Sequence, residues 1–162
     1  IHPFSAPTPL RSGYANSSST PKKAIEGGRF LEPHAIAHCE EPCPYWEYDW
    51  TKQVTAALSL DVTGGEQDCD LALWKFALEM RAVDVAQPDI CYLGGLTRTL
   101  KVVEMARRAG LPVTPHAANM SMVTVFTLQL MGAIENAGPY VEFSSQGRDN
   151  YPGAVDFYYT AL

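Results

Sequence analysis

Apolar and polar residues follow a repeating order along the chain. A short apolar run ends in Gly, Pro or an acidic residue, and a longer segment of helical character follows it. We interpret the short runs as strands and the longer segments as helices. Strands separated by helices of this length imply parallel βαβ units. The predicted strands are residues 35–39, 58–62, 82–87, 111–114 and 140–143, and the predicted helices are residues 21–32, 46–57, 71–80, 97–108 and 121–136.

The helix predicted over residues 97–108 has the clearest pattern. Gly110 follows it as a suitable stop, because glycine readily takes the left-handed conformation that ends a helix. Positions spaced by 4, 3 and 4 residues predict one apolar stripe that ends in an arginine: Leu96, Leu100, Val103 and Arg107.

One ionisable residue follows each predicted strand at a near-constant interval. These residues are Glu40, Glu66, Asp89, His116 and Glu142, and they are separated by 26, 23, 27 and 26 residues. A single residue of this kind is usually a surface carboxylate, but five in phase are hard to explain that way. In a βα barrel the carboxyl ends of the strands converge on one site, whereas a doubly wound sheet spreads them along a crest. The spacing therefore predicts an α/β fold, a partial (β/α)₈ TIM-type barrel with roughly six of the eight βα units present.

Composition narrows the classes of partner. The 162 residues are 46% apolar and 19% charged, which indicates a globular domain. The net charge of -6 argues against nucleic acid and against anionic membranes, because both bind clustered Lys and Arg. The four cysteines lack the paired spacing of a zinc site and fit a reducing cytoplasm. No signal peptide is evident, and the longest apolar stretch, residues 120–134, is too short to span a bilayer.

Two of the in-phase residues suit a divalent cation. Glu40 and Glu66 offer hard oxygen ligands from adjacent strands. Mg²⁺ takes an octahedral set of oxygens, typically carboxylates completed by water and substrate. We therefore expect Mg²⁺ at Glu40 and Glu66, with the neighbouring Glu41 either in a salt bridge or supporting the site.

The other three residues suit proton transfer. Asp89 and His116 follow successive strands, and a carboxylate beside a histidine fixes its tautomer and raises its pKa. His116 is then a candidate general acid or base, the alternative being a cap of the next helix. Glu142, as a neutral carboxylic acid, could donate a hydrogen bond to developing negative charge. These groups together suit abstraction of a proton α to a carboxylate, whose enediolate a divalent cation stabilises.

Five motifs, taken in order, resemble the active-site strands of the enolase superfamily, in its mandelate racemase and muconate lactonizing enzyme-like branch. The resemblance covers residues 13–146, which predicts a partial C-terminal barrel domain over 13–146 with irregular segments at 1–12 and 147–162. The motifs are HCEEPCP at 38–44, TGGEQ at 63–67, QPD at 87–89 with GGLT at 94–97, TPH at 114–116 and YVEF at 140–143.

The resemblance implies an Mg²⁺-dependent enzyme that acts on a small carboxylate or acid sugar. Acid-sugar dehydration, a lyase reaction, is preferred over racemisation. The resemblance also implies a homo-oligomer. By the same resemblance Glu40 and Glu66 are metal ligands, His116, Asp89 and Glu142 are catalytic, and Asn16 faces the substrate.

The chain departs from the family pattern in three ways. Tyr14 stands 26 residues before Glu40, where the family places the first metal-binding aspartate. A Lys-x-Lys strand is absent, and so is any match to the family's N-terminal capping domain and first barrel strands. The chain is therefore a fragment, a truncated product, or a protein that needs partner chains to complete its barrel. The alternative function is an inactive truncated homologue with a structural or binding role, and a pyruvate-type metal aldolase also stays open.

Overall fold

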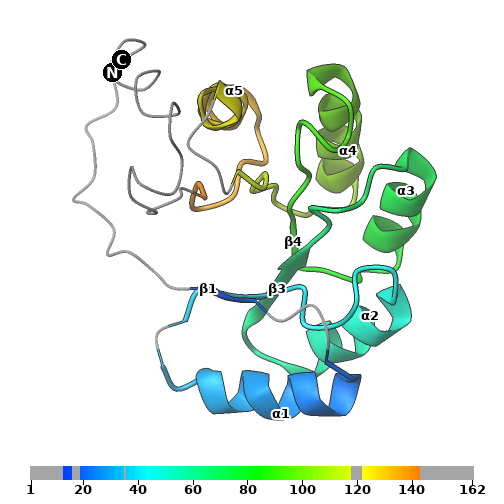
Figure 1. Ribbon diagram of the computed structural model, residues 1–162, viewed down its shortest axis with the longest axis vertical. Coiled ribbons are helices and arrows are strands. Elements are labelled where there is room, and N and C mark those ends of the chain that lie inside the picture. The colour runs from blue at the N-terminus through cyan, green and yellow to red at the C-terminus, as the bar shows by residue number, and fades with distance from the viewer. Residues whose placement is uncertain (1–12, 16–18, 35, 118–121, 143–162) are drawn as a thin grey trace, which may run out of the picture.

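Helices and strands alternate along the part of the chain that the computed structural model describes, which is residues 13–15, 19–34, 36–117 and 122–142. The alternation confirms the predicted α/β fold (Figure 1). The elements are β1 (Gly13–Ala15), α1 (Pro21–Leu31), β2 (His38–Glu40), α2 (Tyr48–Ala57), β3 (Asp61–Gly64), α3 (Leu71–Glu79), β4 (Val85–Ala86), α4 (Leu96–Arg108) and α5 (Met122–Ala133).

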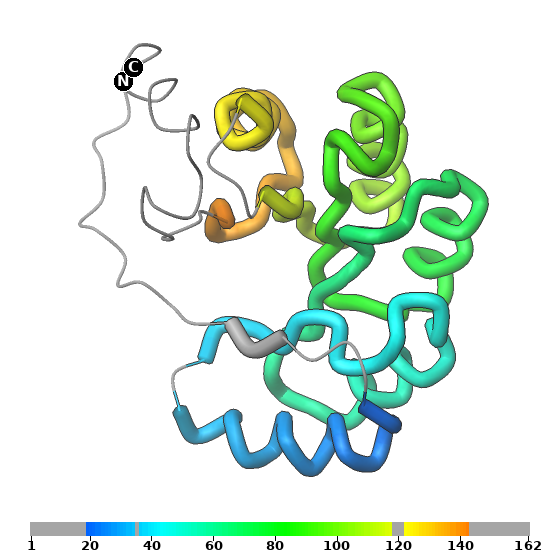
Figure 2. Tube along the Cα trace, in the orientation of Figure 1, coloured from blue at the N-terminus to red at the C-terminus, as the bar shows by residue number. Residues whose placement is uncertain are grey.

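The strands form one parallel sheet in sequence order, β1-β2-β3-β4. Two isolated parallel bridges, Ala86 to Val113 and Val113 to Ala137, continue this order beyond β4. The helices follow one another around the outside of the strands, from α1 through α4 to α5 (Figures 1 and 2). Consecutive parallel strands with helices on one side are the arrangement of a βα barrel, of which the described residues form an arc.

The predicted strand positions are partly wrong. The strand predicted over residues 58–62 begins later, at Asp61, because Leu58 still donates its N–H to Val54 and caps α2. The strand predicted over 111–114 is reduced to the single bridge residue Val113.

The last predicted strand, over residues 140–143, is also wrong as far as it is described. Residues 140–142 have no strand pairing, and Phe143 lies outside the described residues. The pairing occurs earlier, where Ala137 bridges Val113 and Gly138 donates its N–H to the Val113 carbonyl oxygen at 2.8 Å. Pro139 follows directly and has no N–H to continue the ladder.

The core lies between the helices and the outward face of the strands, in two clusters. The buried residues of the larger cluster are Trp74, Leu78, Ala86, Leu93, Val102, Val103, Ala106, Leu111 and Val113. Those of the smaller are Ala24, Cys43, Val54 and Val62. The clusters hold the helices against the strands and leave the carboxyl ends of the strands available for polar side chains.

The apolar stripe predicted for α4 does not face the core. Leu96 and Leu100 are 49% and 45% exposed, and the buried positions are Thr99, Val102, Val103 and Ala106. Thr99 is tolerated there because its hydroxyl donates to the Gly95 carbonyl oxygen, so its burial strands no polar group. Gly110 ends the helix as predicted, with φ +70°.

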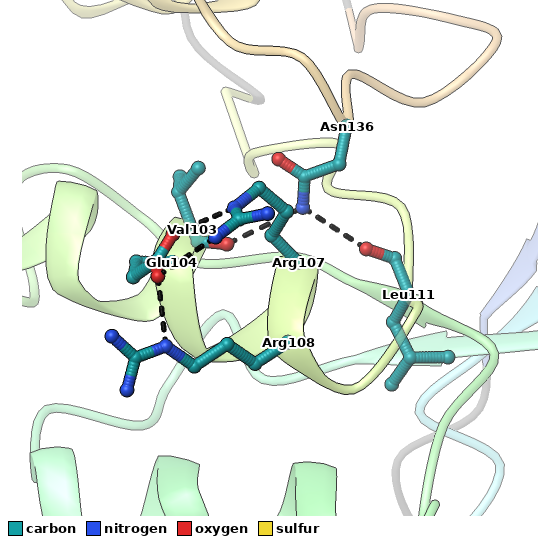
Figure 3. A network of polar contacts seen from close by, with 6 residues as sticks. All are labelled: Val103, Glu104, Arg107, Arg108, Leu111 and Asn136. Carbon is teal, nitrogen blue, oxygen red and sulfur yellow. Dashed lines mark hydrogen bonds and ion pairs between the residues drawn. The ribbon is translucent and has the colours of Figure 1, made fainter.

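Asn136 joins the C-terminal end of α4 to the segment that follows α5 (Figure 3). Its Nδ2 donates to the carbonyl oxygens of Val103, at 3.3 Å, and Leu111, at 3.0 Å. Asn136→Ala removes both hydrogen bonds, so we expect the free energy of unfolding to fall by about 1–2 kcal/mol. Urea denaturation followed by circular dichroism measures the change.

Glu104 provides the matched control on the same helix. Its carboxylate contacts Arg107 at 2.7 Å and Arg108 at 2.8 Å on the exposed face (Figure 3). Exposed ion pairs contribute little to stability, so Glu104→Gln should leave the urea midpoint nearly unchanged. Equal midpoints for the two variants would contradict the role given to Asn136.

Candidate active site

The residues predicted from their spacing lie at the carboxyl ends of consecutive parallel strands. Glu40 is the last residue of β2, and Glu66 follows the end of β3 by two positions. Asp89 follows the end of β4, and His116 follows the bridge residue Val113. Parallel strands bring their carboxyl ends to one edge, which places these side chains together.

His116 lies between two carboxylates. Its Nδ1 is 2.8 Å from Asp89 Oδ2, and its Nε2 is 3.1 Å from Glu66 Oε2. Burial lowers the pKa of His116, but the hydrogen bond to Asp89 and the charges of Glu142 and Glu66 outweigh burial and raise it to about 9. The ring is therefore an imidazolium at neutral pH, and each of its N–H groups has a carboxylate acceptor.

Asp89 is held in place by its own loop. Its carboxylate is almost fully buried, and its Oδ1 accepts the backbone N–H groups of Cys91, at 2.6 Å, and Tyr92, at 2.9 Å. Burial raises the pKa of Asp89, but the hydrogen bonds from His116 and from these N–H groups outweigh it, so the pKa falls below its ordinary value. A fixed, ionised Asp89 orients the His116 ring.

Three carboxylates lie within each other's electric field. Burial and then the charges of Glu142 and Glu66 raise the pKa of Glu40 to about 7, against the effect of a hydrogen bond with Gln87. Burial also raises the pKa of Glu66. Glu142 Oε2 accepts the backbone N–H of Ala117 at 2.8 Å, directly after His116. The structure thus brings together all five residues predicted from the spacing.

Two other residues named from the sequence are not tested by the site geometry. Asn16 lies outside the described residues. Tyr14 belongs to β1, where its backbone pairs with Cys39, while Ala15 pairs with Glu40.

The donor set suits a hard cation only in part. Within the described residues, no three or more His, Cys, Asp or Glu side chains are grouped to hold a metal ion. Glu40 and Glu66 remain as two neighbouring carboxylates whose mutual repulsion a cation would relieve. Mg²⁺ can bind through one or two carboxylates with water and substrate oxygens completing its shell, so the pair fits such an ion.

The sequence did not identify three residues that belong to the site. Gln87 is buried and contributes the hydrogen bond to Glu40. His38 and Tyr140 stack with their ring centroids 4.9 Å apart and their planes at 12°. Each of these two stands two positions before a site carboxylate, Glu40 or Glu142, and side chains two positions apart share one face of an extended chain. That alternation is the signal that could have found them.

None of the described helices is long and apolar enough to cross a membrane. This leaves the carboxyl ends of the strands as the feature of the described chain with the most concentrated chemistry.

The chain is similar to proteins with related names and folds. A presumed racemase of Roseobacter denitrificans has 62% sequence identity and a TM-score of 0.85, over 88% of this chain and 39% of that one. Arabinonate dehydratase of Saccharolobus solfataricus is 28% identical over 137 residues, which is 83% of this chain and 36% of the relative. L-Talarate dehydratase of Polaromonas sp. JS666, solved with Mg and L-glucarate, shares the fold, with 23% identity, a TM-score of 0.68, and coverage of 86% of this chain and 35% of that one.

The chain therefore spans little more than a third of the length of these relatives. Residues 14–158 match the family model for enolase C-terminal domain-like proteins. Since this match covers most of the 162 residues, the chain belongs to the enolase C-terminal domain-like family.

Proposed function

We propose that this protein abstracts the α-proton of a small carboxylate substrate with the help of Mg²⁺, in the dehydration or racemisation of an acid sugar. The observation that carries the proposal is the position of His116 between Asp89 and Glu66. A histidine with both ring nitrogens bonded to carboxylates at the carboxyl ends of parallel strands is built for proton transfer.

The proton on His116 decides what the residue can do first. With a pKa of about 9 the imidazolium is a general acid at neutral pH, able to protonate a departing hydroxyl group at Nε2. His116 becomes a base for the α-proton only after Nε2 loses its own proton and its contact with Glu66. Asp89 keeps the ring oriented through Nδ1 in both states. This order favours dehydration, which needs an acid for the leaving group, over racemisation.

The carboxylates have a second role in the proposal. Glu40 and Glu66 would hold Mg²⁺, which as a Lewis acid supplies stabilisation for the negative charge of an enediolate. Glu142, fixed by the N–H of Ala117, would face the substrate from the other side and, when protonated, donate a hydrogen bond to it.

The acid-sugar substrate class is supported by the names of the relatives. Arabinonate dehydratase acts on a sugar acid by its name, and the Polaromonas dehydratase was solved with L-glucarate. Both are much longer than this chain, so we propose the class of substrate and no individual sugar.

The alternative function is an inactive homologue with a structural or binding role. It is favoured by the metal-ligand set, because the described residues contain no group of three ligands and Tyr14 replaces the carboxylate that the family pattern expects. A phenol with its ordinary pKa is a poor ligand for Mg²⁺.

Calorimetric titration of the chain with Mg²⁺ separates the two functions. We expect a dissociation constant on the order of a millimolar for a site with two carboxylates. Glu66→Gln should abolish the binding heat, since it removes one of the two charged ligands. Glu104→Gln, which removes an exposed carboxylate on α4, should bind like the unmodified chain.

A binding heat that only Glu66→Gln removes would support the enzyme, and assays with acid sugars would follow. No binding heat from the unmodified chain up to roughly 10 mM Mg²⁺ would reject the metal-dependent reaction and leave the inactive homologue.

A further inference from the structure

Two glycines shape the loop between β3 and α3 that carries Glu66. A Cβ at Gly64 would lie 3.3 Å from Glu41 Cγ, so the missing side chain leaves room for Glu41. Gly65 has φ +107°, and a Cβ there would collide with the indole ring of Trp74. The loop therefore lies close to Glu41 at one residue and to Trp74 at the next.

The end of the same loop is fixed by Asp68. The Tyr48 hydroxyl donates to Asp68 Oδ1 at 2.7 Å, and Trp74 Nε1 donates to the Asp68 carbonyl oxygen at 2.9 Å. Asp68 is buried and does not cap α3; Asp70 caps it. Helices α2 and α3 thus hold the loop at the residue two positions after Glu66.

Glu41 completes the contacts of the loop. Its side chain is buried, and its Oε2 accepts a hydrogen bond from Gln67 Nε2 at 3.1 Å. Its backbone N–H donates to the Thr63 carbonyl oxygen at 2.9 Å, and its φ is +38°. A left-handed conformation is unfavourable for a residue with a Cβ and persists only where the surroundings enforce it.

The two partners of this hydrogen bond are the sequence neighbours of the two candidate metal ligands. Glu41 follows Glu40 directly, and Gln67 follows Glu66 directly. The bond between them therefore links the loop after β2 to the loop after β3 at the level of the site, whereas the register of the two strands ends at the pair of Glu40 with Thr63. Beyond that pair, backbone pairing no longer fixes the distance between the loops.

We propose that Glu41 and Gln67 form a brace that sets the separation of Glu40 and Glu66. Both are positioning residues that act through their neighbours. The brace rests on the proposed function for its consequence, the affinity for Mg²⁺, but its geometry exists without metal. Partners of this kind, once removed, commonly cost 10–100-fold in metal affinity, by order of magnitude roughly.

Gln67→Met tests the brace, because methionine has a similar length and cannot donate. Gln67 is exposed, so the thermal midpoint should stay unchanged. In the metal-free chain we expect the ring resonances of His116 to move, since its Nε2 lies 3.1 Å from Glu66, and the four histidines make the spectrum simple to assign. With Mg²⁺, calorimetry should show a dissociation constant about 10-fold higher than that of the unmodified chain.

An exchange of the two side chains provides the rescue. Gln67→Glu alone sets two carboxyl groups against each other and should perturb the same resonances and weaken Mg²⁺ binding. The double substitution Glu41→Gln with Gln67→Glu restores an amide donor and a carboxylate acceptor with the direction reversed, and should recover both readouts. A role in general stability would lower the thermal midpoint instead.

The outcomes separate the brace from the proposed function. Unchanged His116 resonances together with unchanged Mg²⁺ affinity in Gln67→Met would overturn the brace. If the unmodified chain binds no Mg²⁺, the proposed function fails and the resonances alone decide on the brace. Moved resonances that the double substitution restores would then still support it, and unmoved ones would overturn it.

Discussion

Asp89→Asn is expected to lower the pKa of His116 from about 9 by roughly one to three pH units. The substitution removes the hydrogen-bonded negative charge 2.8 Å from Nδ1 and keeps a side chain of the same shape. Burial, which lowers the pKa of His116, is then opposed only by the charges of Glu142 and Glu66. A titration of the His116 ring protons by nuclear magnetic resonance, in metal-free buffer, measures the change.

The same shift links folding to pH. The folded pKa of His116 lies above its ordinary value of 6.5, so the folded state binds the proton more tightly than the unfolded state does. The resulting stabilisation is fully present below about pH 6.5 and is lost as the pH rises through about 9, and it amounts to roughly 2–3 kcal/mol. Asp89→Asn should therefore flatten the fall of the unfolding free energy between pH 6.5 and 9.

His116→Gln is the control for that pH dependence, because it removes the titrating group. The part of the pH dependence due to His116 should be missing from this variant. If the pKa of His116 stayed near 9 in Asp89→Asn, the charges of Glu66 and Glu142 would be holding the proton, and Asp89 would lose its assigned role.

The sequence located the site because each βα unit has a nearly constant length. Glu40, Glu66, Asp89, His116 and Glu142 are brought together even though the predicted bounds of several strands were wrong. An error of two or three residues in a strand changes which backbone groups pair. It does not change which end of the strand the following residue occupies, so the prediction of the site tolerated the error.

The prediction of the packed face of α4 failed for a reason of a different kind. Leu96 and Leu100 fit a helical stripe as well as Val102 and Ala106 do, and periodicity cannot show which side the neighbouring helix occupies. The contact with α3 decides it, and that contact depends on residues distant in sequence.

The support of the site was equally hidden. Glu41 was open between a salt bridge and a supporting role, and its acceptor bond with Gln67 crosses 26 residues of sequence. Hydrogen bonds between loops of separate βα units leave no periodic signal. They become visible only when the two loops are placed side by side.

Tyr14→Asp is expected to strengthen Mg²⁺ binding by about 100-fold, because it adds a third hard, charged ligand to a two-carboxylate set. Position 14 precedes Glu40 by 26 residues, the same interval that separates Glu40 from Glu66. Calorimetry on the unmodified chain and on Tyr14→Asp, under identical conditions, measures the gain.

Ala15→Asp is the matched control, since it introduces the same charge one residue later. The strand register pairs Ala15, and not Tyr14, with Glu40, and successive positions of a strand present their side chains to opposite faces. Only one of the two variants should therefore gain affinity. A gain in Tyr14→Asp would show that the phase of the βα units defines the ligand position, and that the tyrosine weakens a metal site that is otherwise intact. A gain in Ala15→Asp would assign the position to the register instead. If neither variant gained, Glu40 and Glu66 would not converge on a common ion, and the inactive homologue would be the function that agrees with all three measurements.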